Sequence, residues 1–122
     1  MSSSHPVLVV EDDVDVREAM VQVLESAGYP AVSAGDGEEA LARLDGGLTP
    51  CLILLDLMMP RMDGWEFIEQ HHRRAWRAPI VIVSAYGSQE QALGGAGVIA
   101  YMRKPVDIDE LLAVVDRHCP PQ

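Results

Sequence analysis

The stretch Cys51-Leu52-Ile53-Leu54-Leu55-Asp56 decides the fold, because an unbroken apolar run here ends abruptly on a carboxylate. Such a run is typical of a strand buried on both faces, as in a parallel sheet that helices cover from either side. Two other apolar stretches end in charge. The run Val7–Val10 is followed by Glu11-Asp12-Asp13, and Val98–Met102 is followed by a lysine one residue later. Charged residues therefore follow three candidate strands.

Working outward from these runs, strand-like and helix-like segments alternate five times. The remaining strand candidates are 31–34 and 80–84, and the helices are expected to begin after the N-cap aspartates Asp13, Asp36 and Asp107. A glutamate lies three residues beyond each of the last two aspartates, which predicts capping boxes. This alternation predicts an α/β fold with one doubly wound, five-stranded parallel sheet and helices on both faces.

The last two expected helices differ in how strongly the sequence favours a helix. In the last one, Ile108, Leu111, Leu112 and Val115 recur at helical spacing and predict a buried stripe. The fourth helix would fall in 88–97, where three glycines crowd the end of the segment. Each glycine inside a helix costs about 1 kcal/mol relative to alanine. We therefore expect the fourth helix to be short, frayed or missing.

Length and charge narrow the class of protein. The chain has 122 residues and 48% hydrophobic residues, which suits one domain over 1–122. Its formal net charge of -10 argues against direct binding to nucleic acid, which needs a basic surface. No apolar run approaches the roughly 20 residues of a membrane span, and the first residues lack the pattern of a secretory signal. We expect a cytoplasmic protein without membrane insertion.

The two cysteines, Cys51 and Cys119, have neither the spacing of zinc ligands nor a CxxC pattern. Cys51 opens a predicted buried strand, so it is interpreted as a small core residue. Cys119 is interpreted as a free surface thiol.

The carboxyl ends of parallel strands meet at one rim of the sheet, where ligands bind in folds of this class. Glu11, Asp12, Asp56, Ser84 and Lys104 all follow or end predicted strands and should converge there. Three carboxylates repel one another unless a cation joins them, and hard oxygen ligands favour Mg²⁺. A carboxylate can also act as a nucleophile toward a phosphoryl donor, with a lysine and a hydroxyl to stabilise the transferring group. The rim is therefore predicted to perform phosphoryl chemistry on Asp56.

At these motifs the chain resembles the receiver domain of bacterial two-component response regulators, over about 6–118. The resemblance is carried by four segments: Val7-Leu8-Val9-Val10-Glu11-Asp12-Asp13, Leu54-Leu55-Asp56-Leu57-Met58-Met59-Pro60-Arg61-Met62-Asp63-Gly64, Val83-Ser84-Ala85 and Tyr101-Met102-Arg103-Lys104-Pro105.

The resemblance implies a flavodoxin-like strand order of 2-1-3-4-5 and a phosphoprotein rather than an ordinary enzyme. Asp56 would accept the phosphoryl group from a sensor histidine kinase, a phosphotransfer protein or a small phosphodonor. Mg²⁺, which Mn²⁺ can replace, would be held by Asp56, by Asp12 directly, by Glu11 through water, and by the backbone carbonyl of Met58. Lys104 would contact the phosphoryl group.

The resemblance also assigns a switch. Ser84 would move toward the phosphoryl group and Tyr101 would turn inward, changing the surface of the fourth helix, fifth strand and fifth helix that partners bind. The Lys104–Pro105 peptide bond is expected to be cis. The downstream target is open, and the chain is expected to be a monomer or a weak, phosphorylation-dependent dimer.

The chain departs from the family pattern at two positions besides the glycine-rich segment. Met58 and Tyr86 lie two residues beyond Asp56 and Ser84, where side chains line the path of the hydrolytic water in this family. An apolar methionine and a bulky tyrosine should position that water poorly, which predicts slow autodephosphorylation.

Other classes of protein fit less well. Phosphatases that use an aspartyl nucleophile carry Asp-x-Asp after the first strand, whereas here Asp56 follows the third and Met58 stands two residues on. A flavin carrier would need a phosphate-binding loop after the first strand, and none is present. The alternative that stays open is a pseudo-receiver, an interaction module that acts without phosphorylation.

Overall fold

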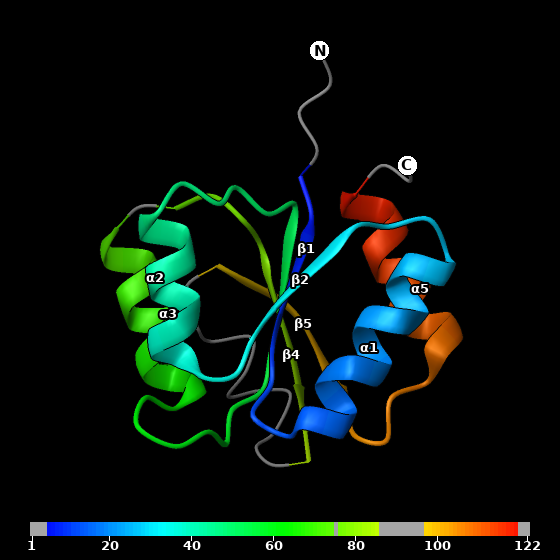
Figure 1. Cartoon of the computed structure of the whole chain (residues 1–122), viewed down its shortest axis with the longest axis horizontal. Helices are drawn as coiled ribbons and strands as arrows, with labels where there is room; N and C mark the ends of the chain where they lie inside the picture. The colour runs from blue at the N-terminus through cyan, green and yellow to red at the C-terminus, as the bar shows by residue number, and fades with distance from the viewer. Residues whose placement is uncertain (1–4, 75, 86–96, 120–122) are drawn as a thin grey trace.

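A computed structural model describes residues 5–74, 76–85 and 97–119 (Figure 1). Five parallel strands form one sheet in the order β2-β1-β3-β4-β5, which confirms the predicted fold class and strand order. The strands are β1 (Val7–Val10), β2 (Ala31–Ala34), β3 (Leu52–Leu55), β4 (Ile80–Ser84) and β5 (Val98–Arg103).

Within the described residues, four helices cover the two faces of this sheet: α1 (Val14–Ser26), α2 (Gly37–Asp45), α3 (Gly64–Arg73) and α5 (Ile108–His118). In Figure 1, α2 and α3 lie together on one side of the strands, and α1 and α5 lie on the other. The short or missing fourth helix was predicted in 88–97, and all of that segment except Gly97 lies outside the described residues, so it stays a prediction.

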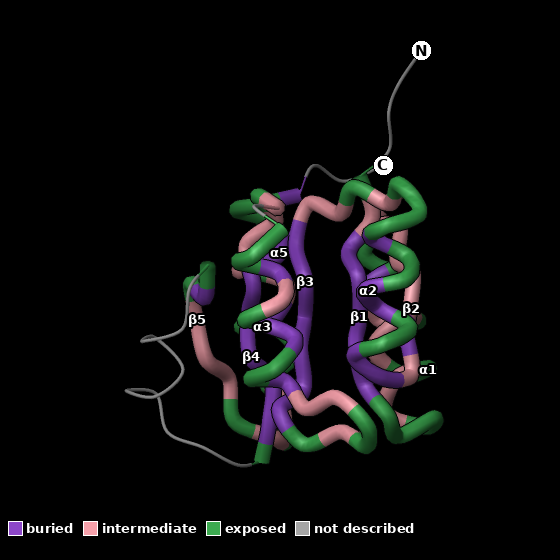
Figure 2. Tube along the Cα trace, turned by 90° about the vertical axis from the view of Figure 1, so that its left-hand side faces the viewer, coloured by how far each residue is buried: buried purple, intermediate pink, exposed green. Residues whose placement is uncertain are grey.

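The apolar strands create two cores because successive side chains point to opposite faces of the sheet. Leu8, Ile53 and Ile82 face the layer of α2 and α3, where Phe67 of α3 is fully buried. Their neighbours along the strands face the layer of α1 and α5. Figure 2 shows the strands β1, β3 and β4 buried along almost their whole length between helices whose outer surfaces are exposed.

The helices begin where the sequence predicts, since local side chains satisfy their first N–H groups. Asp13, Asp36 and Asp107 each accept hydrogen bonds from backbone N–H groups of the first turn. A complete capping box is formed instead at α3, by Asp63 and Glu66. At α2 the carboxylate of the third residue, Glu39, reaches the N–H of Gly35 rather than that of the cap residue. The box predicted there is therefore only half formed.

Two predictions about buried residues were wrong. Cys51 and Cys119 are joined by a disulfide, and Cys119 is 3% exposed rather than a free surface thiol. The fold brings the end of α5 against the start of β3, which local sequence does not reveal. Within the predicted stripe of α5, Leu111 and Val115 are buried, but Ile108 is 45% exposed. Ile108 is the first residue of α5 and therefore lies at the end of the helix–sheet interface.

Among the residues that the structure describes, no helix is both long enough and apolar enough to cross a bilayer.

Candidate functional site

The sheet itself places the candidate site residues, because its hydrogen-bonding ladder continues one residue past the strands. The N–H of Glu11 donates to the carbonyl of Ala34 at 3.1 Å, and the N–H of Asp56 donates to the carbonyl of Val10 at 3.0 Å. These bonds fix the two acidic residues in strand geometry at the carboxyl ends of β1 and β3.

Three carboxylates meet at this rim. Glu11, Asp12 and Asp56 each offer one oxygen, and all three oxygens lie within 4.8 Å of one another. Glu11 and Asp56 are 2% and 6% exposed, whereas Asp12 is exposed. Buried carboxylates at this separation repel one another, and their hard oxygen atoms are ligands that Mg²⁺ prefers. The donor set fits a small divalent cation that one exposed carboxylate leaves accessible from solvent.

Lys104 supplies the positive charge at the rim. Its Nζ lies 2.5 Å from Glu11 Oε1 and 3.6 Å from Asp56 Oδ2. Burial by itself would lower the pKa of Lys104, but its hydrogen bond to Glu11 and the charge of Asp56 outweigh burial and raise that pKa. The lysine therefore stays charged at neutral pH.

Glu11 is less firmly ionised. Burial raises the pKa of Glu11 to about 6, against the hydrogen bonds from Lys104 and the Asp13 N–H that favour its charged form. The net effect means that removal of Glu11 from water costs more than its partners return. A second positive charge at the rim would favour the ionised form further.

The loop after β3 is braced against its surroundings. Asp56 Oδ1 accepts a hydrogen bond from the Met58 N–H at 3.3 Å, and the Gly64 N–H donates to the Leu57 carbonyl at 2.9 Å. Gly64 cannot carry a side chain without collision, since an added Cβ would lie 2.7 Å from Leu57 Cα and 2.8 Å from the Asp56 carbonyl oxygen. The start of α3 thus packs directly against the backbone at Asp56.

A second brace joins this loop to the start of α2. Arg61 has a left-handed backbone, with φ of 65°, and its guanidinium lies 2.5 Å from Asp36 and 3.4 Å from Glu38. The hydrogen bond from Arg61 lowers the pKa of the buried Asp36, so this pair remains ionised. The sequence analysis assigned Asp36 only as a helix cap, and no local pattern indicates its arginine partner.

Ser84 and Tyr101 lie on neighbouring strands, β4 and β5, at the same face of the sheet. Ser84 is 0% exposed, and its carbonyl accepts the N–H of Lys104 at 3.1 Å. Tyr101 is half-buried beside Ile82, which is two residues before Ser84 in β4. Because side chains alternate along a strand, Ser84 and Ile82 point to the same face, and this is the face on which Tyr101 packs.

The structure bears on some of the remaining predicted positions and not on others. The Lys104–Pro105 peptide bond is cis, as the resemblance implied. The Met58 side chain is 55% exposed at the rim. Tyr86 lies outside the described residues, so its position next to the site stays a prediction.

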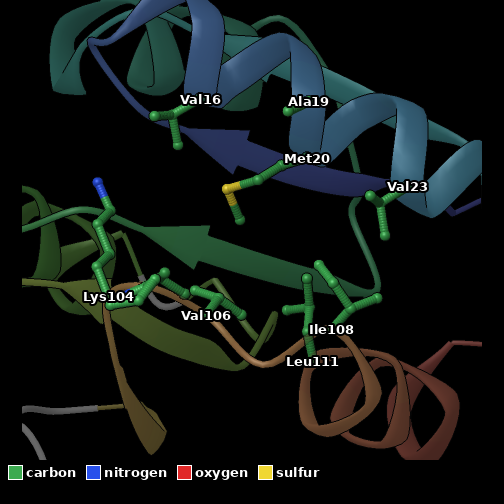
Figure 3. Close-up of a pocket in the computed structure, with 10 residues that line it drawn as sticks. Val16, Ala19, Met20, Val23, Lys104, Val106, Ile108 and Leu111 are labelled. Carbon is green, nitrogen blue, oxygen red and sulfur yellow. The ribbon is translucent and has the colours of Figure 1, made fainter.

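An apolar groove that the sequence analysis missed runs between α1 and α5 (Figure 3). It holds about 500 Å³, and Lys104 closes one end of it. Apolar spacing in α5 was interpreted as core alone, yet Ile108 and Leu111 of that stripe line this groove together with Val16 and Met20 of α1. The two helices therefore do not close fully over the sheet.

Comparison with known proteins agrees with this geometry. The family model for the response regulator receiver domain matches residues 7–116. The chain is 35% identical over 113 residues to the DNA-binding transcriptional regulator NtrC of Salmonella typhimurium, covering 91% of this chain and 24% of NtrC. It is 38% identical over 109 residues to the response regulator MprA of Mycolicibacterium vanbaalenii, covering 88% of this chain and 47% of MprA. The chain thus spans about a quarter to a half of the length of these relatives.

Solved structures give the same result. A response regulator receiver protein from Pseudomonas putida superposes with a TM-score of 0.85 at 33% identity, covering 96% of this chain and 99% of that one. The chemotaxis protein CheY4 of Vibrio cholerae superposes with a TM-score of 0.83 at 29% identity, covering 95% and 99%. With the parallel sheet, the acidic rim and the lysine beside it, these matches show that the chain belongs to the response regulator receiver domain family.

Proposed function

We propose that this receiver domain takes a phosphoryl group onto Asp56 from a sensor histidine kinase, a phosphotransfer protein or a small phosphodonor. A carboxylate oxygen of Asp56 would form the bond to phosphorus while the bond from phosphorus to the donor atom breaks. The observation that carries the proposal is the meeting of Glu11, Asp12 and Asp56 within 4.8 Å, with Lys104 Nζ 3.6 Å from Asp56.

Each side chain at the rim has a physical role in this reaction. Asp12, Glu11, Asp56 and the carbonyl of Met58 would hold Mg²⁺, which when bound neutralises charge on the transferring group. The backbone N–H of Met58, which donates to Asp56, orients the nucleophilic carboxylate. Lys104 would contact a phosphoryl oxygen and stabilise the negative charge that the transfer brings to the rim.

Signalling would follow from the charge that phosphorylation adds. A phosphoryl group brings roughly -1.5 to -2 charges and three acceptor oxygens, and the hydroxyl of Ser84 can donate to one of them. Movement of Ser84 would make room for Tyr101 on the same face of the sheet. Phosphorylation would thereby select a minor conformation in which the surface around β5 and α5 differs.

The proposed setting is the cytoplasm, where the partners are the phosphodonor protein and a downstream target or output domain. The relatives NtrC and MprA are longer than this chain. An output domain joined to this receiver is therefore only a part of the proposal. We propose a monomer, or a weak dimer that depends on phosphorylation.

The test is intact-mass spectrometry after incubation with acetyl phosphate, with and without Mg²⁺, on the wild-type chain and on Asp56→Asn. The proposal expects one phosphoryl adduct that requires Mg²⁺ and that disappears in Asp56→Asn. Glu69→Gln is a control, because Glu69 is exposed on α3 and pairs only with Arg73 at 3.4 Å among the described residues. A correctly folded wild-type chain that forms no adduct would instead be a pseudo-receiver.

A further inference from the structure

The disulfide between Cys51 and Cys119 lies at the end of the sheet opposite to the phosphoacceptor rim. Cys51 directly precedes β3 and Asp56 directly follows it, so one four-residue strand separates the two sites. Cys119 is the C-terminal cap of α5, and its N–H donates to the carbonyl of Val115 at 2.8 Å. The bond therefore joins the last turn of α5 to the strand that carries the phosphoacceptor.

The rest of α5 is lightly held. Only Leu111 and Val115 are buried among its eleven residues, and the groove of about 500 Å³ separates part of the helix from α1. In Figure 3, Ile108 and Leu111 lie along the α5 side of this groove, and Ile108 is 45% exposed whereas Leu111 also belongs to the core. Near its end the helix is also held by a hydrogen bond, which the Tyr29 hydroxyl donates to Asp116 Oδ1 at 2.7 Å. The disulfide is thus a covalent restraint on the end of α5, added to the buried Val115 and to this hydrogen bond.

The sheet does not depend on this restraint. The strand residues of β1, β3 and β4 are 0–2% exposed, and their pairing uses backbone bonds that the disulfide does not touch. The chain should therefore remain folded when the bond is opened. A disulfide that opens while the chain stays folded would differ from a structural disulfide, whose loss often abolishes the folding of small secreted domains.

From these observations we propose that Cys51 and Cys119 form a redox-modified site that controls how firmly the end of α5 is held to the sheet. The reactant class is a dithiol reductant. The proposal rests on the proposed function only for the cytoplasmic setting, where disulfides are uncommon and, when present, are usually transient and redox-sensing.

The exchange follows ordinary thiol–disulfide chemistry. A thiolate of the dithiol attacks Cys51 Sγ, which belongs to the less buried of the two residues, and Cys119 leaves as a thiolate that takes up a proton. The second thiol of the reductant then attacks the mixed disulfide and releases Cys51 as a thiol. Two electrons pass from the dithiol to the protein, and the dithiol becomes a cyclic disulfide. The reverse reaction restores the bond.

Hydrogen-exchange mass spectrometry on the oxidised and the dithiothreitol-reduced chain tests this proposal, with alkylation to count free thiols. On reduction, backbone amides in 111–118 should exchange about tenfold faster or more, because the end of the helix opens locally. Amides in 80–84, at the centre of the sheet, should keep their protection. The double variant Cys51→Ala with Cys119→Ala should match the reduced chain and ignore dithiothreitol.

Three results would overturn the proposal. The first is that oxidised glutathione does not convert the two thiols to the disulfide, and the second is that dithiothreitol opens the disulfide only when the chain unfolds. The third is that the backbone amides of α5 exchange at the same rate in both redox states. Because the wild-type chain supplies both states, the conclusion stands even if the double variant folds poorly. None of these readouts involves phosphorylation, so failure here leaves the adduct experiment on Asp56 unaffected, and the reverse also holds.

Discussion

Lys104 is bound more closely to Glu11 than to Asp56: its Nζ lies 2.5 Å from Glu11 Oε1 but 3.6 Å from Asp56 Oδ2. The lysine therefore neutralises the buried glutamate. A cation that binds to the same carboxylates must compete with this charge, whereas an arriving phosphoryl group would be attracted by it.

Lys104→Met should change metal binding and phosphorylation in opposite directions. Loss of the positive charge should strengthen Mg²⁺ binding severalfold, because two like charges no longer share the rim. It should also slow phosphorylation by about a hundredfold, the typical effect of removing one charge-stabilising donor. Calorimetric titration with Mg²⁺ and the rate of adduct formation measure the two effects. Lys104→Arg keeps the charge and should bind Mg²⁺ like the wild type, and weaker Mg²⁺ binding by Lys104→Met would refute the explanation.

Met58→Gln should shorten the lifetime of the phosphorylated chain. The Met58 side chain is 55% exposed beside Asp56, and its thioether cannot orient a water as an amide can. We expect faster loss of the adduct in the presence of Mg²⁺, followed by intact mass over time. Met58→Leu is the matched control and should decay like the wild type. A wild-type lifetime of seconds would contradict the slow autodephosphorylation predicted here.

Gly64→Ala should destabilise the chain by about 1–3 kcal/mol, the usual cost of overpacking. The added Cβ would meet backbone atoms of Asp56 and Leu57 within 2.8 Å, and backbone cannot move aside without shifting the site. At the control Gly35→Ala, the nearest atoms are the flexible ends of the Arg17 and Glu39 side chains, at 3.2 and 3.4 Å, so the added methyl group disturbs at most their hydrogen bonds and displaces no backbone. Urea denaturation compares the two variants, and equal stabilities would show that the loop relaxes freely.

His71 should make stability depend on pH in a defined direction. Burial lowers the pKa of His71 below its ordinary value of 6.5, and its Nε2 has no hydrogen-bond partner within the described part of the chain. Below about pH 6.5 the imidazole of His71 is protonated in the unfolded chain but still neutral in the folded chain. The free energy of unfolding therefore decreases as the pH is lowered from about 6.5 to the pKa of the folded chain. The slope can reach about 1.4 kcal/mol per pH unit for one group.

In the variant His71→Gln, the free energy of unfolding should depend less steeply on pH, whatever its absolute value. Urea denaturation at pH 7.5, 6.5 and 5.5 measures this dependence. The raised pKa of Glu11 acts in the opposite direction, but it contributes equally to both proteins and cancels in the comparison. The exposed His118 in the last turn of α5 gives the control His118→Gln, since the charge of the adjacent His72 is itself one cause of the lowered pKa of His71. An unchanged slope in His71→Gln would rule out His71 as the source.

The sequence predicted those parts of the molecule that depend on neighbours along the chain. Strand ends at Glu11 and Asp56 and the caps at Asp13 and Asp107 follow from local apolar runs and short hydrogen bonds. The strand order came from the family resemblance, because nothing in a single apolar run states which other strand it joins.

The features that were missed depend on contacts between distant segments. Cys51 and Cys119 are 68 positions apart, and their pairing depends on where α5 ends relative to β3. The pair of Arg61 and Asp36 joins two loops in the same way, 25 positions apart. The spacing of residues within one segment carries no information on such long-range contacts. They depend on how the fold brings distant segments together.

The backbone bond from the Cys51 N–H to the Pro6 carbonyl, at 3.0 Å, has a practical consequence when combined with the disulfide to Cys119. The described part of the chain begins near Pro6 and ends at Cys119, and both lie at the end of the sheet where β3 begins, away from Asp56. A surface anchor or fluorescent fusion attached at either end would therefore leave the acidic rim facing solvent. Immobilisation through either end would therefore suit measurements of the proposed phosphorylation, provided that the attachment does not disturb the last turn of α5.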